Sequence, residues 1–105
     1  MTGRRTVRVA PSFFDQLDAQ LSGERGLSGE PSAGDFLLVD LPLIAEEFAV
    51  NFDRLMILEA EHPEFRSLVT TGLLVPSVLV TGVLGSDYVV SLISVRIDLG
   101  LGWDG

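Results

Sequence analysis

The segment from Tyr88 to Leu99 has the sequence YVVSLISVRIDL and carries the clearest secondary-structure signal in the chain. Its apolar residues are interleaved with serine, arginine and aspartate, as in a β-strand with one buried and one polar face. Residues Gly85–Asp87 separate it from a second stretch rich in valine and leucine, Leu73–Val83. A three-residue connection that contains glycine is typical of a β-hairpin. The sequence therefore predicts two paired strands here, followed by a tail over residues 100–105.

Two shorter strands are predicted elsewhere. Within Phe65–Thr71, the residues Leu68–Thr71 form a β-type run that a glycine follows. Near the N-terminus, Thr6–Ala10 has two valines that alternate with arginine and threonine, the period of a strand.

The first predicted helix covers residues 12–21. Ser12 is a favourable N-cap, and Asp15 follows three residues later, as in a capping box. Phe13 and Leu17 recur at helical spacing, with polar residues between them. Residues 22–34 are rich in glycine and serine and predict a loop between helices.

A second helical stripe follows that loop, and Ser32 to Asp35 offers another capping signal. The stripe consists of Leu37, Leu41, Ile44, Phe48, Phe52 and Leu55. Pro42 interrupts it, because proline lacks a backbone N–H and clashes with the preceding turn. The chain around Pro42 can therefore adopt one of two structures. Either a short helix over residues 33–40 kinks into a longer helix, or Phe36–Asp40 is a strand. The stripe keeps its phase across Pro42, which favours the kinked helix, and His62-Pro63 is the expected stop.

The predicted fold is a single α+β domain over residues 1–105, with the element order β-α-α-β-β-β. Short connections between the last three strands imply a mainly antiparallel sheet. Two amphipathic helices then pack on one face of that sheet.

Composition excludes several kinds of site. The chain has no cysteine and one histidine, so thiolate sites and histidine cages are excluded, and we expect no metal ion and no cofactor. It has no lysine, which excludes a P-loop. Its 15 acidic and 7 basic residues give a net charge of −8, which disfavours direct nucleic-acid binding.

The sequence also predicts a cytoplasmic location. No apolar segment follows the N-terminal arginines, as a signal peptide would require. The longest nearly apolar stretch, Leu73–Leu84, has 12 residues and is too short to cross a bilayer, so no membrane contact is expected.

Two stretches resemble the RelE/ParE toxin superfamily of bacterial toxin–antitoxin systems. The first is Val7–Leu17, a short strand followed by a helix; the second is Arg66–Val69 together with the Val/Ile-rich strand Val89–Val95. The resemblance implies that the first strand lies next to the last and that both helices pack on one side. It also implies a toxin that acts by binding a protein such as DNA gyrase and is neutralised by an antitoxin protein.

Two alternatives remain open beside the toxin. One is a non-toxic binding or assembly domain of the same fold, which the acidic charge and the uncharged stretch Leu73–Val83 favour. The other is a ribosome-dependent ribonuclease, which requires a local positive patch formed by Arg54, Arg66 and Arg96. Because few basic residues are present, we expect binding rather than catalysis.

The candidate residues for contact with a partner or target are Arg54, Arg66, Tyr88 and Arg96. For Arg66 the competing interpretation is an exposed salt bridge with Glu61 or Glu64. Arg96 has an equally ordinary interpretation as a solvated strand position. His62 is expected at a helix C-terminus rather than in a metal site. Trp103 has no assigned role.

Overall fold

The computed structural model of this protein describes residues 4–21, 32–71 and 77–98. Its elements, in chain order, are β1 (Val7–Val9), α1 (Pro11–Gln20), α2 (Ala33–Asn51), the 3-10 helix η1 (Phe52–Arg54), β2 (Met56–Glu59), β3 (His62–Thr70), β4 (Ser77–Leu84) and β5 (Val90–Asp98). The expected tail, Trp103, residues 22–31 of the expected loop and the start of Leu73–Val83 lie outside the described residues.

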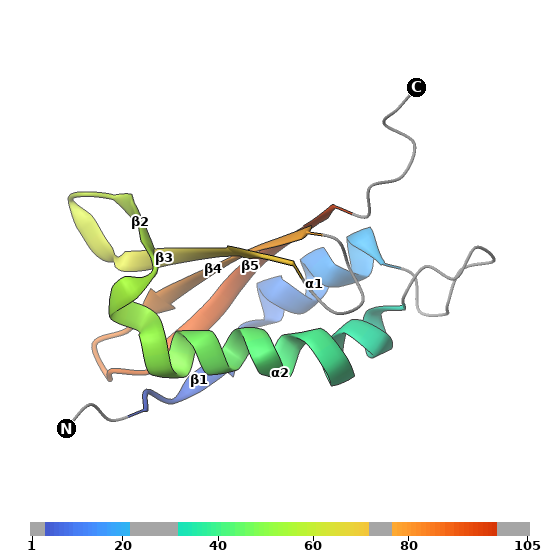
Figure 1. The fold of residues 1–105 in the computed structure, drawn as a ribbon, viewed down its shortest axis with the longest axis horizontal. Helices are drawn as coiled ribbons and strands as arrows, with labels where there is room; N and C mark the ends of the chain where they lie inside the picture. The colour runs from blue at the N-terminus through green and yellow to red at the C-terminus, as the bar shows by residue number, and fades with distance from the viewer. Residues whose placement is uncertain (1–3, 22–31, 72–76, 99–105) are drawn as a thin grey trace.

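The strands form one sheet in the order β1-β5-β4-β3-β2. β1 pairs with β5 in parallel, and the other neighbours are antiparallel. Both helices lie on the same side of the sheet, with α2 running beneath it (Figure 1). The α+β class, the mainly antiparallel sheet and the position of the first strand beside the last are confirmed.

One strand is missing from the sequence prediction. The second helix ends at Asn51 rather than near His62, and β2 then pairs with the start of β3. Three consecutive apolar residues, Met56-Ile57-Leu58, make up most of β2, so it lacks the alternation that identifies a strand. His62 consequently opens β3 and does not lie at a helix C-terminus, which corrects that expectation.

The first helix begins one residue earlier than predicted, and Ser12 is not its N-cap. Ala10 occupies the cap position without a side-chain hydrogen bond, and Pro11 is at the start of the helix, where its fixed φ suits helical geometry. The Ser12 hydroxyl instead donates to the carbonyl of Ile93 in β5 at 2.8 Å. The expected capping box with Asp15 therefore does not form.

The second capping signal is confirmed. The Asp35 backbone N–H donates to Ser32 Oγ at 3.1 Å, and the Ser32 backbone N–H donates to Asp35 Oδ2 at 3.0 Å. Helix α2 thus begins inside the expected loop and continues through Pro42 as one helix, so the strand alternative for Phe36–Asp40 is wrong. Pro42 removes the hydrogen bond to the carbonyl of Leu38, but both residues are exposed, where water can hydrate that carbonyl.

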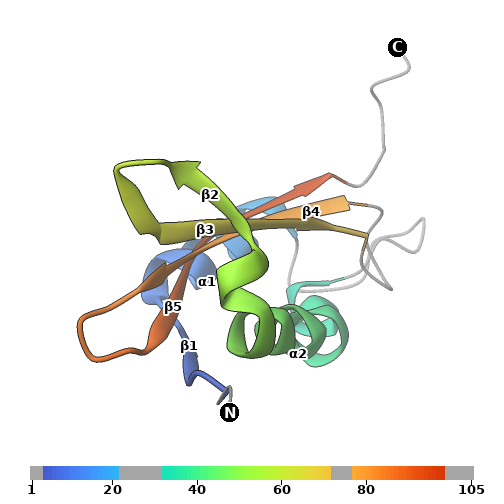
Figure 2. The same cartoon turned by 60° about the vertical axis from the view of Figure 1, so that its left-hand side comes forward.

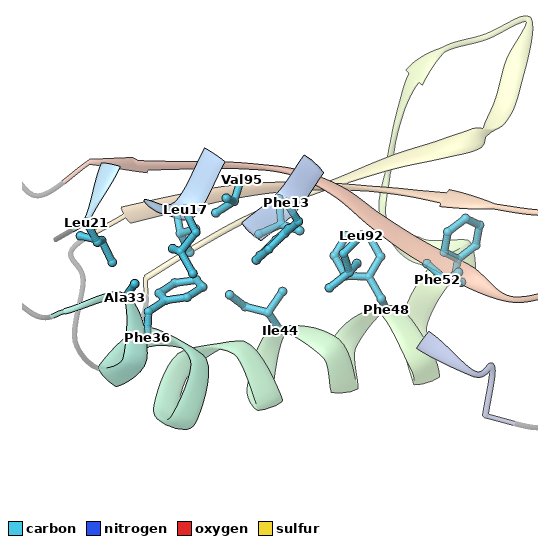
Figure 3. Packing of buried hydrophobic residues seen from close by; sticks show 13 residues of the cluster. Phe13, Leu17, Leu21, Ala33, Phe36, Ile44, Phe48, Phe52, Leu92 and Val95 are labelled. Atoms are coloured by element: carbon cyan, nitrogen blue, oxygen red, sulfur yellow. The ribbon is translucent and has the colours of Figure 1, made fainter. Parts of the chain in front are cut away.

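The core lies between the sheet and the two helices. Figure 3 shows Phe13 and Leu17 of α1 beside Phe36, Ile44 and Phe48 of α2. The sheet contributes Val78 and Val80 of β4 and Val90, Leu92 and Val95 of β5. Burying one side chain of this size contributes roughly 1.5–3 kcal/mol, so this single layer of contacts is the main stabilising element of the domain.

β1 pairs with β5 only over residues 90–92, and beyond them side chains of α1 form hydrogen bonds to the edge of β5. Gln16 Oε1 accepts from the Val95 backbone N–H at 3.0 Å. Gln20 donates to the Val95 carbonyl and accepts from the Ile97 N–H, both at 2.6 Å. The two glutamines therefore take the place of a neighbouring strand, which protects this edge from pairing with another chain.

Candidate functional site

Arg66 is held by backbone carbonyls rather than by the acidic residues considered for it. Its Nη1 donates to the carbonyls of Phe52, Asp53 and Leu55 at 3.2, 3.0 and 3.1 Å. Its Nε donates to the Pro63 carbonyl at 2.7 Å. The guanidinium also lies 5.1 Å from the centre of the Phe52 ring. Arg66 thus fixes the corner between α2 and the β2–β3 hairpin.

Arg66 and Arg96 lie on opposite faces of the sheet. Arg66 pairs with Gly82, whose Cα faces Phe48 of α2. Arg96 pairs with Leu79, which lies three positions from Gly82 on β4 and therefore faces away from the helices. Arg54 is exposed in η1 beside the Arg66 corner. The three arginines do not form the single patch that the ribonuclease alternative requires.

Tyr88 lies in the β4–β5 connection rather than in a strand. That connection covers residues 85–89, so the expected three-residue loop is wrong. Tyr88 adopts a left-handed backbone with φ of 64°, and its side chain is 75% exposed. The Asp87 carboxylate stabilises the turn by accepting the Val89 N–H at 3.1 Å. None of the other three candidate residues shares this loop.

The described residues form neither a metal-binding cluster nor a membrane-spanning helix. Within residues 4–21, 32–71 and 77–98, no group of three histidine, aspartate or glutamate side chains is placed to hold a metal ion. His62 instead pairs with Glu64, with Nδ1 and Oε2 3.4 Å apart. No helix in the described part of the chain is long and apolar enough to span a membrane.

The outer side of α2 is unusually apolar for an exposed helix surface. Leu38 is 81% exposed and Leu43 is 55% exposed, and Val39 and Val50 are also exposed. Only one side of α2 contacts the core, and these four apolar residues are not part of it.

A groove of about 520 Å³ lies between α2 and β3. Its apolar lining comes from Leu43 and Ile44 of α2 and Leu68 of β3. We refer to it as the α2–β3 groove. Its polar lining residues are Asp40, Glu46, Glu47, Thr70 and Thr71. The described lining therefore contains acidic and neutral side chains and no basic ones.

Two of these acids have defined partners. Glu46 receives hydrogen bonds from Arg4, one of them 2.7 Å from Nη2 to Oε1. These hydrogen bonds hold the pKa of Glu46 below its ordinary value, so it is ionised at neutral pH. Glu47 accepts from the Asn51 side chain at 3.2 Å. Both acids lie on the part of α2 that lines the groove, but the charge of Glu46 is paired with that of Arg4, so Glu47 makes this rim of the groove negative.

The β2–β3 hairpin is a second exposed apolar feature. Met56, Ile57 and Leu58 of β2 are all exposed, and β2 forms the edge of the sheet. Figures 1 and 2 show the tip of the hairpin extending away from both helices. The Arg66 contacts at its base connect this hairpin rigidly to the end of α2.

Sequence reasoning did not find the groove, although one signal for it was present. Leu38, Val39 and Leu43 are apolar residues that fall off the core-facing stripe, and an exposed apolar group of this kind often marks a contact surface. Neither a known family model, nor a curated protein, nor a solved structure matches this chain.

Proposed function

We propose that this chain is a protein-binding module that contacts its partner through the outer side of α2 and the α2–β3 groove. The observation that carries the proposal is the set of exposed apolar residues on α2, headed by Leu38 and Leu43. Exposed apolar surface next to a groove is typical of protein interaction sites. Of the three arginines that the ribonuclease alternative requires together, Arg96 lies on the opposite sheet face from Arg66, and Arg66 is engaged by backbone carbonyls.

A selection from a library of random twelve-residue peptides displayed on phage tests this proposal. We expect selected peptides to bind the wild-type chain, with Kd values of about 100 μM or tighter. The double variant Leu38→Ser with Leu43→Ser should bind them at least tenfold more weakly, because it removes exposed apolar contacts without altering the buried core.

Leu58→Ser provides the matched control. Leu58 is 50% exposed, close to the 55% of Leu43, but it lies in β2, outside α2 and outside the lining of the groove. Peptides that bind the double variant as well as the wild type would contradict the proposed surface, as would a selection that enriches no sequence.

The toxin hypothesis is the specific form of this proposal. It is supported by the strand order, in which β1 lies beside β5, and by the placement of both helices on one face (Figure 1). Both features agree with what the resemblance to the RelE/ParE superfamily implies. In this form the partner is an antitoxin and the target is a protein such as DNA gyrase.

Induction of the chain alone in a bacterial host tests the toxin hypothesis. We expect growth arrest relative to an empty vector, and relief of the arrest in the variant with Leu38→Ser and Leu43→Ser if target binding uses the α2 surface. Unimpaired growth in the presence of soluble, folded protein would favour the non-toxic binding or assembly domain. A defect in DNA supercoiling before one in translation would support a gyrase-like target.

A further inference from the structure

The edge of β3 next to the groove is open. β2 pairs with β3 only as far as Met56 opposite Ser67. β4 continues along the other side of β3 to the pair Thr70 and Val78. Leu68–Thr70 therefore has a neighbouring strand on one side and, among the described elements, none on the other. Such an edge can accept a further strand through its backbone groups.

The α2–β3 groove lies beside this open edge. Leu68 pairs with Val80, and Thr70 pairs with Val78, and both valines are buried on the helix side of the sheet. Because side chains alternate along a strand, a strand added at this edge would direct every second side chain toward α2. The apolar floor of Leu43, Ile44 and Leu68 is placed to receive such a side chain.

The charge of the groove indicates what kind of chain segment can bind there. The polar lining of the groove is acidic or neutral, and the whole chain has a net charge of −8. A second copy of the chain would bring the same negative charge to a negative rim, which opposes self-association. A strand in which an apolar residue is followed two positions later by arginine or lysine presents both side chains to the groove and complements both the floor and the rim.

We propose that the α2–β3 groove binds an extended, basic segment of a partner protein, which adds a strand to β3 at Leu68–Thr70. Its apolar side chains lie against Leu43 and Leu68, and its basic side chains face Glu47. The inference rests on the proposed binding function and specifies the conformation and charge of the bound segment. Main-chain hydrogen bonds to β3 supply affinity, while the groove supplies specificity.

The test uses the blocked hexapeptide Thr-Val-Thr-Arg-Thr-Val, called the arginine–valine peptide, because its valine and arginine residues lie on the same face of a strand. The peptide is titrated into the full chain and followed by NMR. We expect amide shifts concentrated at residues 68–71 and 43–47, with cross-strand contacts between the peptide backbone and β3. A peptide with glutamate in place of arginine should bind at least tenfold more weakly. A peptide with proline at alternate positions should also lose binding, because proline cannot donate to the strand edge.

Variants of the protein test whether the peptide binds in the groove. Leu43→Arg should weaken binding of the arginine–valine peptide at least tenfold. Leu58→Arg is the matched control, because it makes the same change at a similarly exposed leucine of β2 outside the groove lining, and it should change the affinity less than twofold. Glu47→Gln should weaken binding about threefold and reduce its dependence on salt. The amide spectrum of each free variant verifies its fold.

Several results would overturn the inference. Equal losses in Leu43→Arg and Leu58→Arg would show that the peptide does not bind in the groove, and helical structure in the bound peptide would contradict an added strand. Failure to bind the arginine–valine peptide at millimolar concentration would also reject it. If phage selection still yields binders that depend on Leu38 and Leu43, the proposed function stands and only the extended basic segment is wrong. Concentration-dependent dimers in sedimentation would identify a second copy as the occupant.

Discussion

Replacing Gly82 with alanine is expected to lower the free energy of unfolding by about 1–3 kcal/mol, although alanine is normally better tolerated than glycine inside a strand. A Cβ atom at this position would lie 2.7 Å from Cε1 and 2.9 Å from Cδ1 of Phe48. It would also lie 3.2 Å from Cγ1 of Val90. Phe48 is fully buried in the core, so its ring can move only by displacing other side chains.

Chemical denaturation of Gly82→Ala and of Phe48→Leu, singly and together, measures this clash. The double variant should be more stable than the sum of the two single effects predicts, because the smaller leucine leaves room for the added methyl group. Gly34→Ala is the matched control: the nearest atom to its Cβ is Ser32 Oγ at 3.7 Å, and the variant should be neutral or more stable by up to about 1 kcal/mol. Equal stability of Gly82→Ala and the wild type would show that α2 does not pack this closely on β4.

Arg66→Ala is expected to lower the free energy of unfolding by about 2–3 kcal/mol. The substitution removes the donor for the carbonyls of Phe52, Asp53, Leu55 and Pro63 and the cation above the Phe52 ring. The carbonyls of Phe52, Asp53 and Leu55 lie where the chain leaves α2 and enters the hairpin. Amide hydrogen exchange in β2 should therefore increase more than exchange in β5.

Two further variants separate a structural role of Arg66 from contact with a partner. Arg66→Lys keeps the charge but replaces a planar group that donates from both Nη1 and Nε with a single ammonium nitrogen, so we expect it to recover less than half of the lost stability. Arg96→Ala, an exposed change on β5, should alter stability by less than about 0.5 kcal/mol. If Arg66→Ala leaves stability and β2 exchange unchanged, the carbonyl contacts do not hold the corner, and a role in partner contact regains support.

Some elements of this fold are predicted by patterns in the sequence, whereas others depend on contacts between distant residues. The strand β5 is visible in the sequence because apolar and polar residues alternate on both sides of the adjacent pair Leu92 and Ile93. The start of α2 is visible because Ser32 and Asp35 form hydrogen bonds to each other's backbone N–H. β2 is not visible, because three consecutive apolar residues have no periodicity and the helical phase continues into Leu55. The chain reverses at that corner through contacts with Arg66, which lies 11 residues further on.

The same distinction applies to the candidate site. Residue type alone identifies its four candidates, Arg54, Arg66, Tyr88 and Arg96. The sequence does not show that the sheet register places Arg66 and Arg96 on opposite faces. The α2–β3 groove combines Leu43 with Leu68, residues from different elements that only packing brings together.

Periodicity and capping signals in the sequence were sufficient to predict the α+β class, the two helices and the strands whose apolar residues alternate, because these signals depend on interactions between near neighbours in the chain. Composition added the acidic charge and the absence of cysteine. The end of the second helix, the part of β3 that has no second neighbouring strand among the described elements, and the acids that border an apolar groove became known from the tertiary structure. Those features depend on contacts between residues far apart in the chain, so no local sequence pattern predicts them.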